Sequence, residues 1–369
     1  MDRIIKWFKI STDDTQQHSV SLTEPMTTEN TFEFEDVKEP NVYFISNHYP
    51  VVIGDKFRNR YTIIGKLGSG GFSNVLLCRD LKEKRHIALK IVKGRNTFAD
   101  VALNEIDILK SIRHFDALAP HKGKIVQLLD NFKFTGVSGT HICMVFNVLG
   151  QNLSKLLIKN GNKGIPLVDV KNIIKQVLEA LDFLHTTCKI IHGDIKPGNI
   201  CINGNEVTLA DLGSACWINH VPFYDGIQTR QYRSPEVILA VSYQSNADIW
   251  STACVAFELA TGSFLFPEFL SRNEMAKDEQ HLARIVELLG DVPKQLFLKN
   301  KYSKNFFTGE GKLIRFPEIK SFGVFEVLTE KFNWEENEAR GFVEFLLPML
   351  AIDPDKRCSA QDCLGHKWL

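Results

Sequence analysis

The spacing of hydrophobic positions changes near residue 150. Before it, short runs rich in Val, Ile and Leu are separated by glycine or charged residues, which is typical of β-strands joined by turns. Between residues 98 and 112, Ala102, Ile106 and Leu109 recur at helical spacing instead, which predicts one helix. We expect strands over residues 61–66, 74–78, 86–92, 125–129 and 142–148.

Beyond residue 150 the helical spacing dominates. Val170, Ile173, Val177, Leu181 and Leu184 form one amphipathic face, and the same spacing fits residues 247–260, 279–289 and 340–349. The pattern predicts an α+β fold, in which a small β-rich lobe with one main helix joins a larger helical lobe.

The chain divides into an extension and one two-lobed domain. Residues 11–40 hold eight acidic residues and one lysine among many Ser and Thr. We therefore expect residues 1–45 to form a flexible acidic extension, with a docking motif as the alternative. We place the domain at residues 46–369, with lobes at about 46–146 and 151–369 and a hinge at 147–150.

The overall composition argues against several classes of function. Lys+Arg and Asp+Glu both number 44, so the basic surplus of a nucleic-acid coat or a polybasic membrane binder is missing, and we expect neither partner. The chain has no apolar run of about 18 residues that would span a bilayer. Its eight cysteines lack zinc-ribbon or C-x-x-C spacing, which indicates the cytoplasm or nucleus. We expect a monomer.

A glycine-rich segment leads into the second expected strand. Its residues are Leu67, Gly68, Ser69, Gly70, Gly71, Phe72, Ser73, Asn74 and Val75. Glycine lets a backbone turn tightly and present N–H groups to a phosphate. Because a strand follows where a dinucleotide fingerprint would start a helix, two interpretations remain: a hairpin lid over nucleotide phosphates, or a structural hairpin.

Lys90 lies in the apolar run 86–92, two residues after Ala88. A buried ammonium group is costly unless it is paired, and Glu105 lies on the expected helix. A Lys90–Glu105 pair would satisfy both charges and direct the ammonium group at phosphate oxygens. The alternative is a surface lysine whose stem covers apolar side chains.

The strongest chemical signal lies at residues 192–199, followed by 211–213. Asp194 is placed to orient a hydroxyl group or accept its proton, and Lys196 can neutralise charge on a transferred phosphoryl group. Asn199 and Asp211 supply oxygen ligands of the kind that Mg²⁺ takes together with nucleotide phosphates. This arrangement predicts phosphoryl transfer.

With these motifs the chain resembles the eukaryotic protein kinases over about residues 55–369. That resemblance implies ATP and Mg²⁺ as cofactors, Phe146 as the gatekeeper, and Val148 and Leu149 as hinge residues that contact the adenine.

Other landmarks of the kinases match in chain order. The resemblance implies that Glu236 of the Ser-Pro-Glu element pairs with Arg357, and that Asp248 braces the backbone of the catalytic loop. It also implies that Leu109, His192 and Leu212 stack between the lobes.

Longer stretches are similar to the serine/arginine-rich (SR) protein kinases. They are residues 139–146, 210–217, 228–236, 247–254 and 323–328. This narrower resemblance implies phosphorylation of Ser in Arg-Ser repeats of RNA-binding and splicing proteins. A related kinase with other substrates and a pseudokinase scaffold are the alternatives.

The chain also departs from the kinase pattern. Gly193 replaces the Arg that many kinases use to hold an activation-loop phosphate, so we expect activity without that phosphorylation. The alternative for Gly193 itself is a flexible loop residue. A tight turn at residues 203–205 replaces the insert that SR protein kinases often have between their lobes.

Substrate recognition is expected around the end of the activation segment, which the kinase resemblance places between Asp211 and Glu236. Arg230 and Arg233 could form a basic pocket for a residue after the target Ser, or pair with local carboxylates. We expect Thr229 to bond to Asp194 or Lys196. Of the acidic residues that line the docking groove of the family, this chain retains Glu287. Ser263 and Gln280 replace Asp in that groove, which predicts weak arginine docking.

Overall fold

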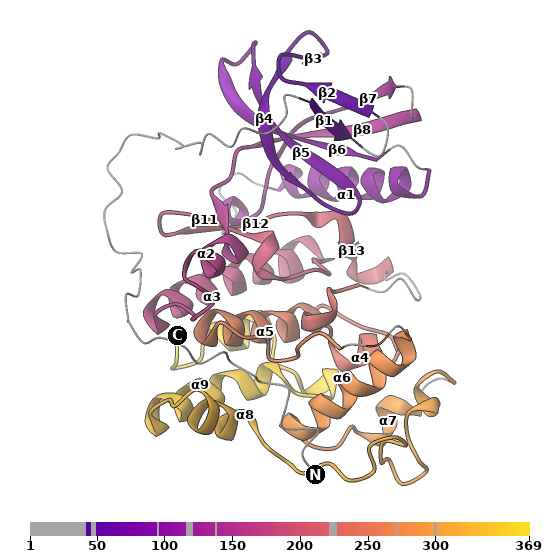
Figure 1. The fold of residues 1–369 in the computed structure, drawn as a ribbon, viewed down its shortest axis with the longest axis vertical. Coiled ribbons are helices and arrows are strands. Elements are labelled where there is room, and N and C mark those ends of the chain that lie inside the picture. The colour runs from indigo at the N-terminus through magenta and orange to yellow at the C-terminus, as the bar shows by residue number, and fades with distance from the viewer. Residues whose placement is uncertain are drawn as a thin grey trace.

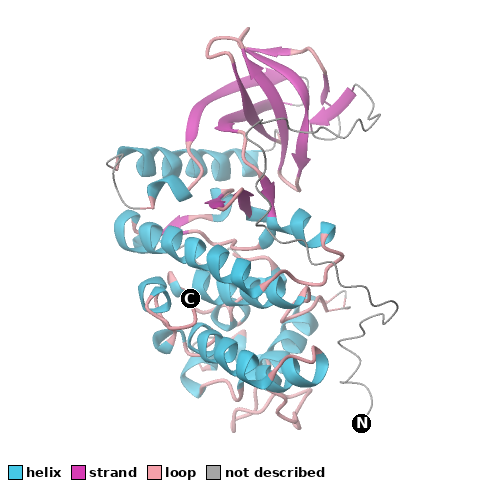
Figure 2. Cartoon of the chain, turned by 90° about the vertical axis from the view of Figure 1, so that its left-hand side faces the viewer, coloured by secondary structure: helices cyan, strands magenta, loops and turns pink. Residues whose placement is uncertain are grey.

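The computed structural model describes residues 42–45, 49–93, 96–115, 121–136, 139–220, 227–269, 271, 273–298 and 301–369. A β-rich lobe with helix α1 (Asn96–His114) lies above a larger helical lobe (Figures 1 and 2), which confirms the expected α+β class. Among the described residues, no helix is both long and apolar enough to span a bilayer.

The upper lobe is built on a six-stranded antiparallel sheet in the order β3-β4-β5-β6-β8-β7. One face packs against α1, and the other encloses Tyr61, Ile63, Leu76 and Ile87. The strands are β3 (Lys56–Phe57), β4 (Tyr61–Ser69), β5 (Ser73–Asp80), β6 (Arg85–Val92), β7 (Leu128–Gly136) and β8 (Gly139–Asn147), with a separate hairpin of β1 (Val42–Ile45) and β2 (Tyr49–Val52).

The lower lobe is organised around α5 (Asn246–Thr261), which is apolar on nearly all sides and correspondingly buried. Helix α3 (Leu167–Asp182) packs against it. The other helices are α2 (Leu153–Lys159), α4 (Pro235–Ile238), α6 (Glu274–Leu289), α7 (Lys294–Phe297), α8 (Val324–Glu326), α9 (Glu336–Met349) and α10 (Ala360–Leu364). Short strands line its top: β9 (Gln151–Asn152), β10 (Ile190–Ile191), β11 (Ile200–Asn203), β12 (Glu206–Leu209) and β13 (Cys216–Trp217).

One predicted strand is wrong in extent. The run 125–129 was expected to be a strand, but β7 begins at Leu128. Ile125 instead forms a single parallel bridge with Leu209, and the N–H of Val126 donates to the carbonyl of Leu209 at 2.9 Å. The first apolar residues of this run therefore join the upper lobe to β12 rather than extend the sheet.

The expected extension lies mostly outside the described residues. Of residues 1–45, the structure describes the last four, which form β1. The tight turn expected at residues 203–205 is confirmed, because Asn203 pairs with Glu206 across the β11–β12 hairpin.

A buried ion pair ties the activation segment to the base of the lower lobe. The guanidinium of Arg357 donates to both carboxylate oxygens of Glu236 at 2.7 and 2.9 Å, and both side chains are fully buried. Arg357 also donates to the carbonyls of Ala351 and Asn246 and lies over the ring of Trp250. The pairing expected from the sequence is confirmed.

We expect Glu236→Gln to lower the free energy of unfolding by about 3–5 kcal/mol, because it leaves the Arg357 charge buried without a counter-charge. Urea denaturation measures this loss. The matched control is Glu344→Gln, whose ion pair with Lys367 is exposed and whose loss should not change stability measurably. Equal effects of the two variants would contradict the assignment.

Candidate active site

A lysine and two carboxylates meet where the two lobes join. Lys90 Nζ on β6 lies 2.8 Å from both carboxylate oxygens of Glu105 on α1, and 2.8 Å from Oδ1 of Asp211 after β12. The expected Lys90–Glu105 pair is confirmed, so Lys90 is not a surface lysine: its side chain is 13% exposed. Helix α1 is thus held toward the lower lobe.

Burial and charge oppose each other in this triad. Burial by itself would lower the pKa of Lys90, but the carboxylates of Glu105 and Asp211 outweigh it and raise that pKa above its usual range. Burial would likewise raise the pKa of Asp211, yet the ammonium group of Lys90 holds it below its usual range. For Glu105 burial prevails over Lys90 and raises the pKa. The ammonium and the Asp211 carboxylate are therefore charged near neutral pH.

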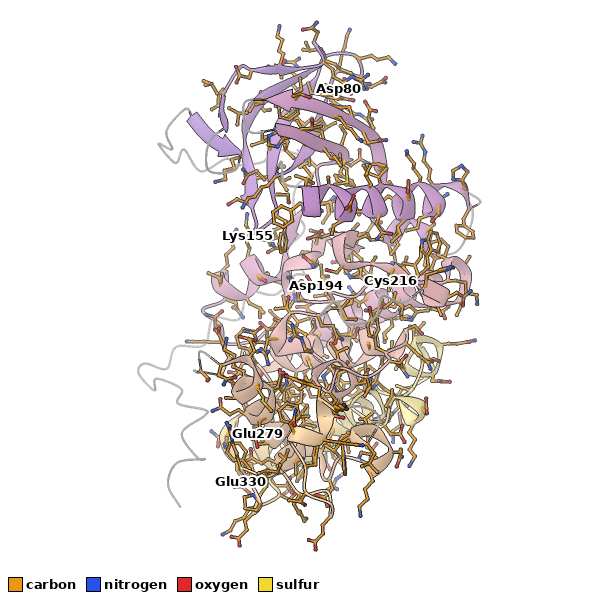
Figure 3. All side chains as sticks on the ribbon, turned by 90° about the vertical axis from the view of Figure 1, so that its right-hand side faces the viewer. Asp80, Lys155, Asp194, Cys216, Glu279 and Glu330 are labelled. Carbon is orange, nitrogen blue, oxygen red and sulfur yellow. The ribbon has the colours of Figure 1, made fainter. Side chains whose placement is uncertain are left out.

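Asp194 is the centre of a second cluster, at the level where the lobes meet (Figure 3). Its Oδ2 lies 2.7 Å from Lys196 Nζ, and its Oδ1 accepts from the hydroxyl of Thr229 at 2.7 Å. Lys196 also donates to Thr229 Oγ1 at 2.9 Å, which confirms the expected role of Thr229. The carboxylate is therefore fixed in one orientation by a cation and a hydroxyl group.

Asn199 links Asp194 to the expected metal position. Its Nδ2 donates to the backbone carbonyl and to Oδ2 of Asp194, at 2.9 and 3.0 Å, which leaves Oδ1 of Asn199 as the atom that could bind a cation. Asp211, at a left-handed φ of 60°, supplies a carboxylate. In the described residues no three His, Cys, Asp or Glu side chains form a metal cluster. The amide oxygen of Asn199 and the carboxylate of Asp211 are donors that fit Mg²⁺, a cation that takes its other ligands from phosphates and water.

The buried carboxylate of Asp248 on α5 holds the backbone of the catalytic loop. It accepts from the N–H groups of His192 and Gly193 at 2.8 and 2.9 Å and from the ring of His185 at 2.8 Å. Burial would raise the pKa of Asp248, but the hydrogen bond from His185 and the other donors hold it below its usual range. The expected bracing role of Asp248 is confirmed.

Gly193 is not a flexible loop residue. Its φ is +79°, and a Cβ at this position would lie 2.5 Å from the carbonyl oxygen of Ser214. Both features favour glycine. The absence of a Cβ lets the catalytic loop lie close to Ser214, near the start of the activation segment. Next to it, the ring of His192 bonds to the carbonyl of Ala210, and the expected partners Leu109 and Leu212 lie in one buried cluster.

The glycine-rich segment forms a hairpin. Ser69 pairs with Asn74 across β4 and β5, and the N–H of Gly70 donates to the carbonyl of Ser73 at 2.8 Å. At the tip, Phe72 is 66% exposed and its ring contacts that of Phe98 on α1. A Cβ added at Gly68 or Gly71 would meet no atom within 4 Å, so the hairpin has open space beside its backbone.

The residues expected around the adenine belong to one buried cluster. Ala88 pairs with Phe146 across β6 and β8, and each is 8% exposed. Leu67, Val75 and Leu149 pack against the same cluster, and Val148 is half-buried beside Leu149. The structure thus places Ala88 beside Phe146, and contact of the whole set with an adenine stays a prediction.

Arg230 was expected either to form a basic pocket or to pair with local carboxylates, and the structure shows the local pairs. Arg230 is bonded to Glu274 and Asp278 of α6, each at 2.8 Å, and Asp278 also accepts from the hydroxyl of Tyr302. Arg233 donates twice to the carbonyl of Gln228.

The acids of α6 likewise pair with cations of the same lobe. Glu287 is paired with Arg284, and Glu279 with Arg315. Figure 3 shows Glu279 in the lower lobe, well below Asp194.

Sequence reasoning missed the role of Gln228, which is 4% exposed. Its side chain donates to the carbonyl of Ala247 and to Ser251 on α5, and accepts from the N–H and hydroxyl groups of Ser234. Its backbone N–H donates to the carbonyl of Gly193 at 2.8 Å. Gln228 thus joins the catalytic loop, the activation segment and α5. A buried glutamine has no distinctive sequence signal, so the fold was needed to find it.

Tyr232 and Glu258 form a second anchor that the sequence did not indicate. The hydroxyl of Tyr232 donates to Glu258 Oε2 at 2.6 Å, and both residues are buried. Burial raises the pKa of Glu258 to about 7, although the hydrogen bond from Tyr232 opposes the shift. A carboxyl group that titrates near neutrality therefore lies beneath the end of the activation segment.

Comparisons with known proteins agree with this geometry. The protein kinase domain family matches residues 61–369. SRSF protein kinase 3 of Mus musculus is 33% identical, over 91% of this chain and 91% of its own length. The serine/threonine-protein kinase SRPK of Physarum polycephalum is 37% identical over 89% of this chain and 90% of its own. Protein kinase dsk1 of Schizosaccharomyces pombe is 31% identical over 89% and 84%.

The chain therefore belongs to the protein kinases and, within them, to the SR protein kinase family. It is accordingly a serine/threonine protein kinase whose substrates are proteins.

We expect the free energy of unfolding of Glu258→Gln to rise relative to that of the unsubstituted protein as the pH rises. A carboxyl group whose pKa is raised from 4.5 to about 7 binds more protons in the folded than in the unfolded chain between those values. Its contribution to stability therefore falls as the pH rises through that window. Glutamine cannot ionise and keeps an acceptor for Tyr232.

Denaturation should show that the difference in free energy of unfolding between the variant and the unsubstituted protein grows by roughly 2–3 kcal/mol from about pH 5 to about pH 8. Glu206→Gln, at an exposed position on β12, is the matched control and should give a flat difference. A flat difference for Glu258→Gln as well would show that this carboxyl group does not titrate near neutrality.

Proposed function

We propose that the chain transfers the γ-phosphoryl group of ATP, with Mg²⁺, to Ser in Arg-Ser repeats of RNA-binding and splicing proteins. The observation that supports this most is the pair of clusters between the lobes: Lys90 with Glu105 and Asp211, and Asp194 with Lys196 and Thr229. They provide a fixed cation, a metal-ligating carboxylate and an oriented base in one region.

Each residue has a chemical task in this proposal. Lys90, held by Glu105, binds the α- and β-phosphates. Asn199 and Asp211 hold Mg²⁺, which supplies charge neutralisation on the phosphates when it is bound. Leu67 to Val75 cover the nucleotide, and Ala88, Phe146, Val148 and Leu149 surround the adenine.

The second cluster acts on the acceptor. Asp194 orients the hydroxyl of the substrate Ser and takes its proton, because its carboxylate is held in one orientation by Thr229 and Asn199. Lys196, 2.7 Å from Asp194, neutralises charge on the phosphoryl group in transit. With the Lys90–Glu105 pair formed, these complete clusters argue against a pseudokinase.

The preference for Arg-Ser repeats rests on the resemblance to SR protein kinases, with relatives named SRSF protein kinase 3 and SRPK, and on acidic groups near the end of the activation segment. Glu274, Asp278, Glu279 and Glu287 lie on α6. Each is paired with a cation of the chain, so a substrate arginine must compete for it. We infer that arginine docking is weak and that few serines are modified in each encounter. Arg230 is paired with Glu274 and Asp278, so recognition of residues near the target Ser falls to Arg233, which donates to the carbonyl of Gln228.

We also infer that the chain acts as a monomer in the cytoplasm or nucleus, without binding nucleic acid directly. The equal numbers of basic and acidic residues support the last point.

Transfer of labelled phosphate from MgATP to three peptides of matched length tests the substrate. They contain Arg-Ser, Lys-Ser or Ser-Pro repeats, and we expect labelling of the Arg-Ser peptide above the others. Asp194→Ala should lower its rate about a thousandfold, because the base is lost. Equal labelling of the Lys-Ser or Ser-Pro peptide would favour the related kinase with other substrates, and no labelling of any peptide would favour the scaffold.

We expect activity without phosphorylation of the activation segment. Gln228 bonds to Gly193, to α5 and to Ser234. These bonds hold the activation segment against the catalytic loop, which an ion pair between a phosphate and an arginine at position 193 would otherwise do. Enzyme treated with a phosphatase should keep its rate.

Gln228→Ala should lower kcat roughly ten- to a hundredfold, because buried hydrogen bonds of the segment are lost. Gln244→Ala, at an exposed position before α5, is the matched control, and a thermal melt verifies that both variants are folded. A large loss of rate after phosphatase treatment would contradict the proposal.

A further inference from the structure

Two cysteine side chains touch at the start of α10, an element that carries none of the residues assigned to catalysis. The sulfur atoms of Cys358 and Cys363 lie 2.8 Å apart, and both cysteines are free thiols. Cys358 directly follows Arg357, which holds Glu236. Cys363 lies in the last turn of the helix.

The local fold fixes this contact. Ser359 is the N-cap of α10 and forms a capping box with Asp362: the hydroxyl of Ser359 accepts from the N–H of Asp362 at 3.2 Å, and the N–H of Ser359 donates to Asp362 Oδ2 at 2.9 Å. The residue before an N-cap and the fourth residue of the helix usually form an apolar contact that fixes the entry of the chain. Here Cys358 and Cys363 occupy those two positions, so the capping box holds one thiol against the other.

The two thiols differ in accessibility and ionisation. Cys358 is partly exposed, whereas Cys363 is 3% exposed. The hydrogen bond from the Cys363 thiol lowers the pKa of Cys358 despite its partial burial, and the nearby Arg357 guanidinium contributes to the lowering. The thiolate is the reactive form of cysteine, so Cys358 is the sulfur that would react first with an oxidant.

We propose that Cys358 and Cys363 are an oxidation site that forms an intramolecular disulfide across the start of α10. With hydrogen peroxide as the oxidant, the Cys358 thiolate attacks one peroxide oxygen and becomes a sulfenic acid, and the released hydroxide takes up a proton to leave as water. The Cys363 sulfur then attacks the Cys358 sulfur, the S–S bond forms, and a second water leaves. Two thiols and one peroxide thus give one disulfide and two waters.

The fold can accept this bond with little movement. A disulfide is about 2.05 Å long, so the sulfur atoms need to approach by about 0.8 Å. The bond would replace a contact that the helix already makes and would close a short loop next to Arg357. It lies apart from Lys90 and Asp194. We therefore expect it to stabilise the lower lobe without changing the rate of phosphoryl transfer.

Tryptic peptide mass spectrometry of the full-length protein, without reduction, tests the proposal directly. Both cysteines lie in one expected peptide, residues 358–367, because the next Lys or Arg after Arg357 is Lys367. After the reduced protein is exposed to hydrogen peroxide and its remaining thiols are alkylated, we expect this peptide unalkylated and lighter by two hydrogen atoms. Appearance of the peptide as oxygen adducts, as a cross-link between two chains, or fully alkylated would overturn the proposal.

Variants separate this site from other thiols. Cys363→Ala should abolish the lighter peptide. Cys201→Ser removes the other partly exposed thiol and should leave the lighter peptide unchanged. Oxidation should raise the Tm of the unsubstituted protein and of Cys201→Ser by roughly 3–5 °C, but not that of Cys363→Ala. A fall in Tm on disulfide formation would contradict the expected fit of the bond, and the mass measurement on the unsubstituted protein stands even if a variant does not fold.

Discussion

The carboxylate of Asp248 is the point on which the catalytic geometry depends. It lies inside the lower lobe on α5 and accepts from two consecutive N–H groups of the catalytic loop and from His185. A buried carboxylate is tolerated because these donors replace water. Asp248 thus fixes the loop that bears Asp194 to α5, a helix that is buried along nearly its whole length. Gln228 fixes the activation segment to the same helix.

Charged side chains in and below the site are held in ion pairs. Lys90 lies between two carboxylates, Arg357 is enclosed with Glu236, and Arg230 bridges two acids of α6. These pairs serve different purposes. In the proposed function the Lys90 triad offers an ammonium group and a carboxylate to a nucleotide and its metal, whereas the Arg357 pair is inaccessible and structural. The pairs on α6 lower the effective negative charge that a basic substrate would meet.

Gly193 shows how one residue changes the way the site is held. Without an arginine at this position, a phosphate in the activation segment would find no guanidinium from the catalytic loop. The left-handed φ of Gly193 lets its carbonyl accept from Gln228 while its N–H donates to Asp248. These hydrogen bonds join the catalytic loop, the activation segment and α5 without an added phosphate.

The sequence by itself determined the α+β class, most strands and helices, and the residues of the catalytic motifs. It could do so because hydrophobic spacing reports one-dimensional periodicity and because the motifs are contiguous: Asp194, Lys196 and Asn199 lie within six residues of one another. The cost of an unpaired buried ammonium group also predicted the Lys90–Glu105 pair, with a surface lysine as the alternative.

The tertiary structure decided what depends on distant partners. Arg230 had two interpretations until α6 placed Glu274 and Asp278 beside it. Residues 125–127 were predicted to be part of a strand, but Ile125 and Val126 pair with Leu209 of β12 instead. The roles of Gln228 and Glu258 were missing from the sequence account altogether. Glutamine and glutamate look alike in a sequence whether they are solvated or enclosed, because burial and hydrogen-bond partners are set by residues far away along the chain.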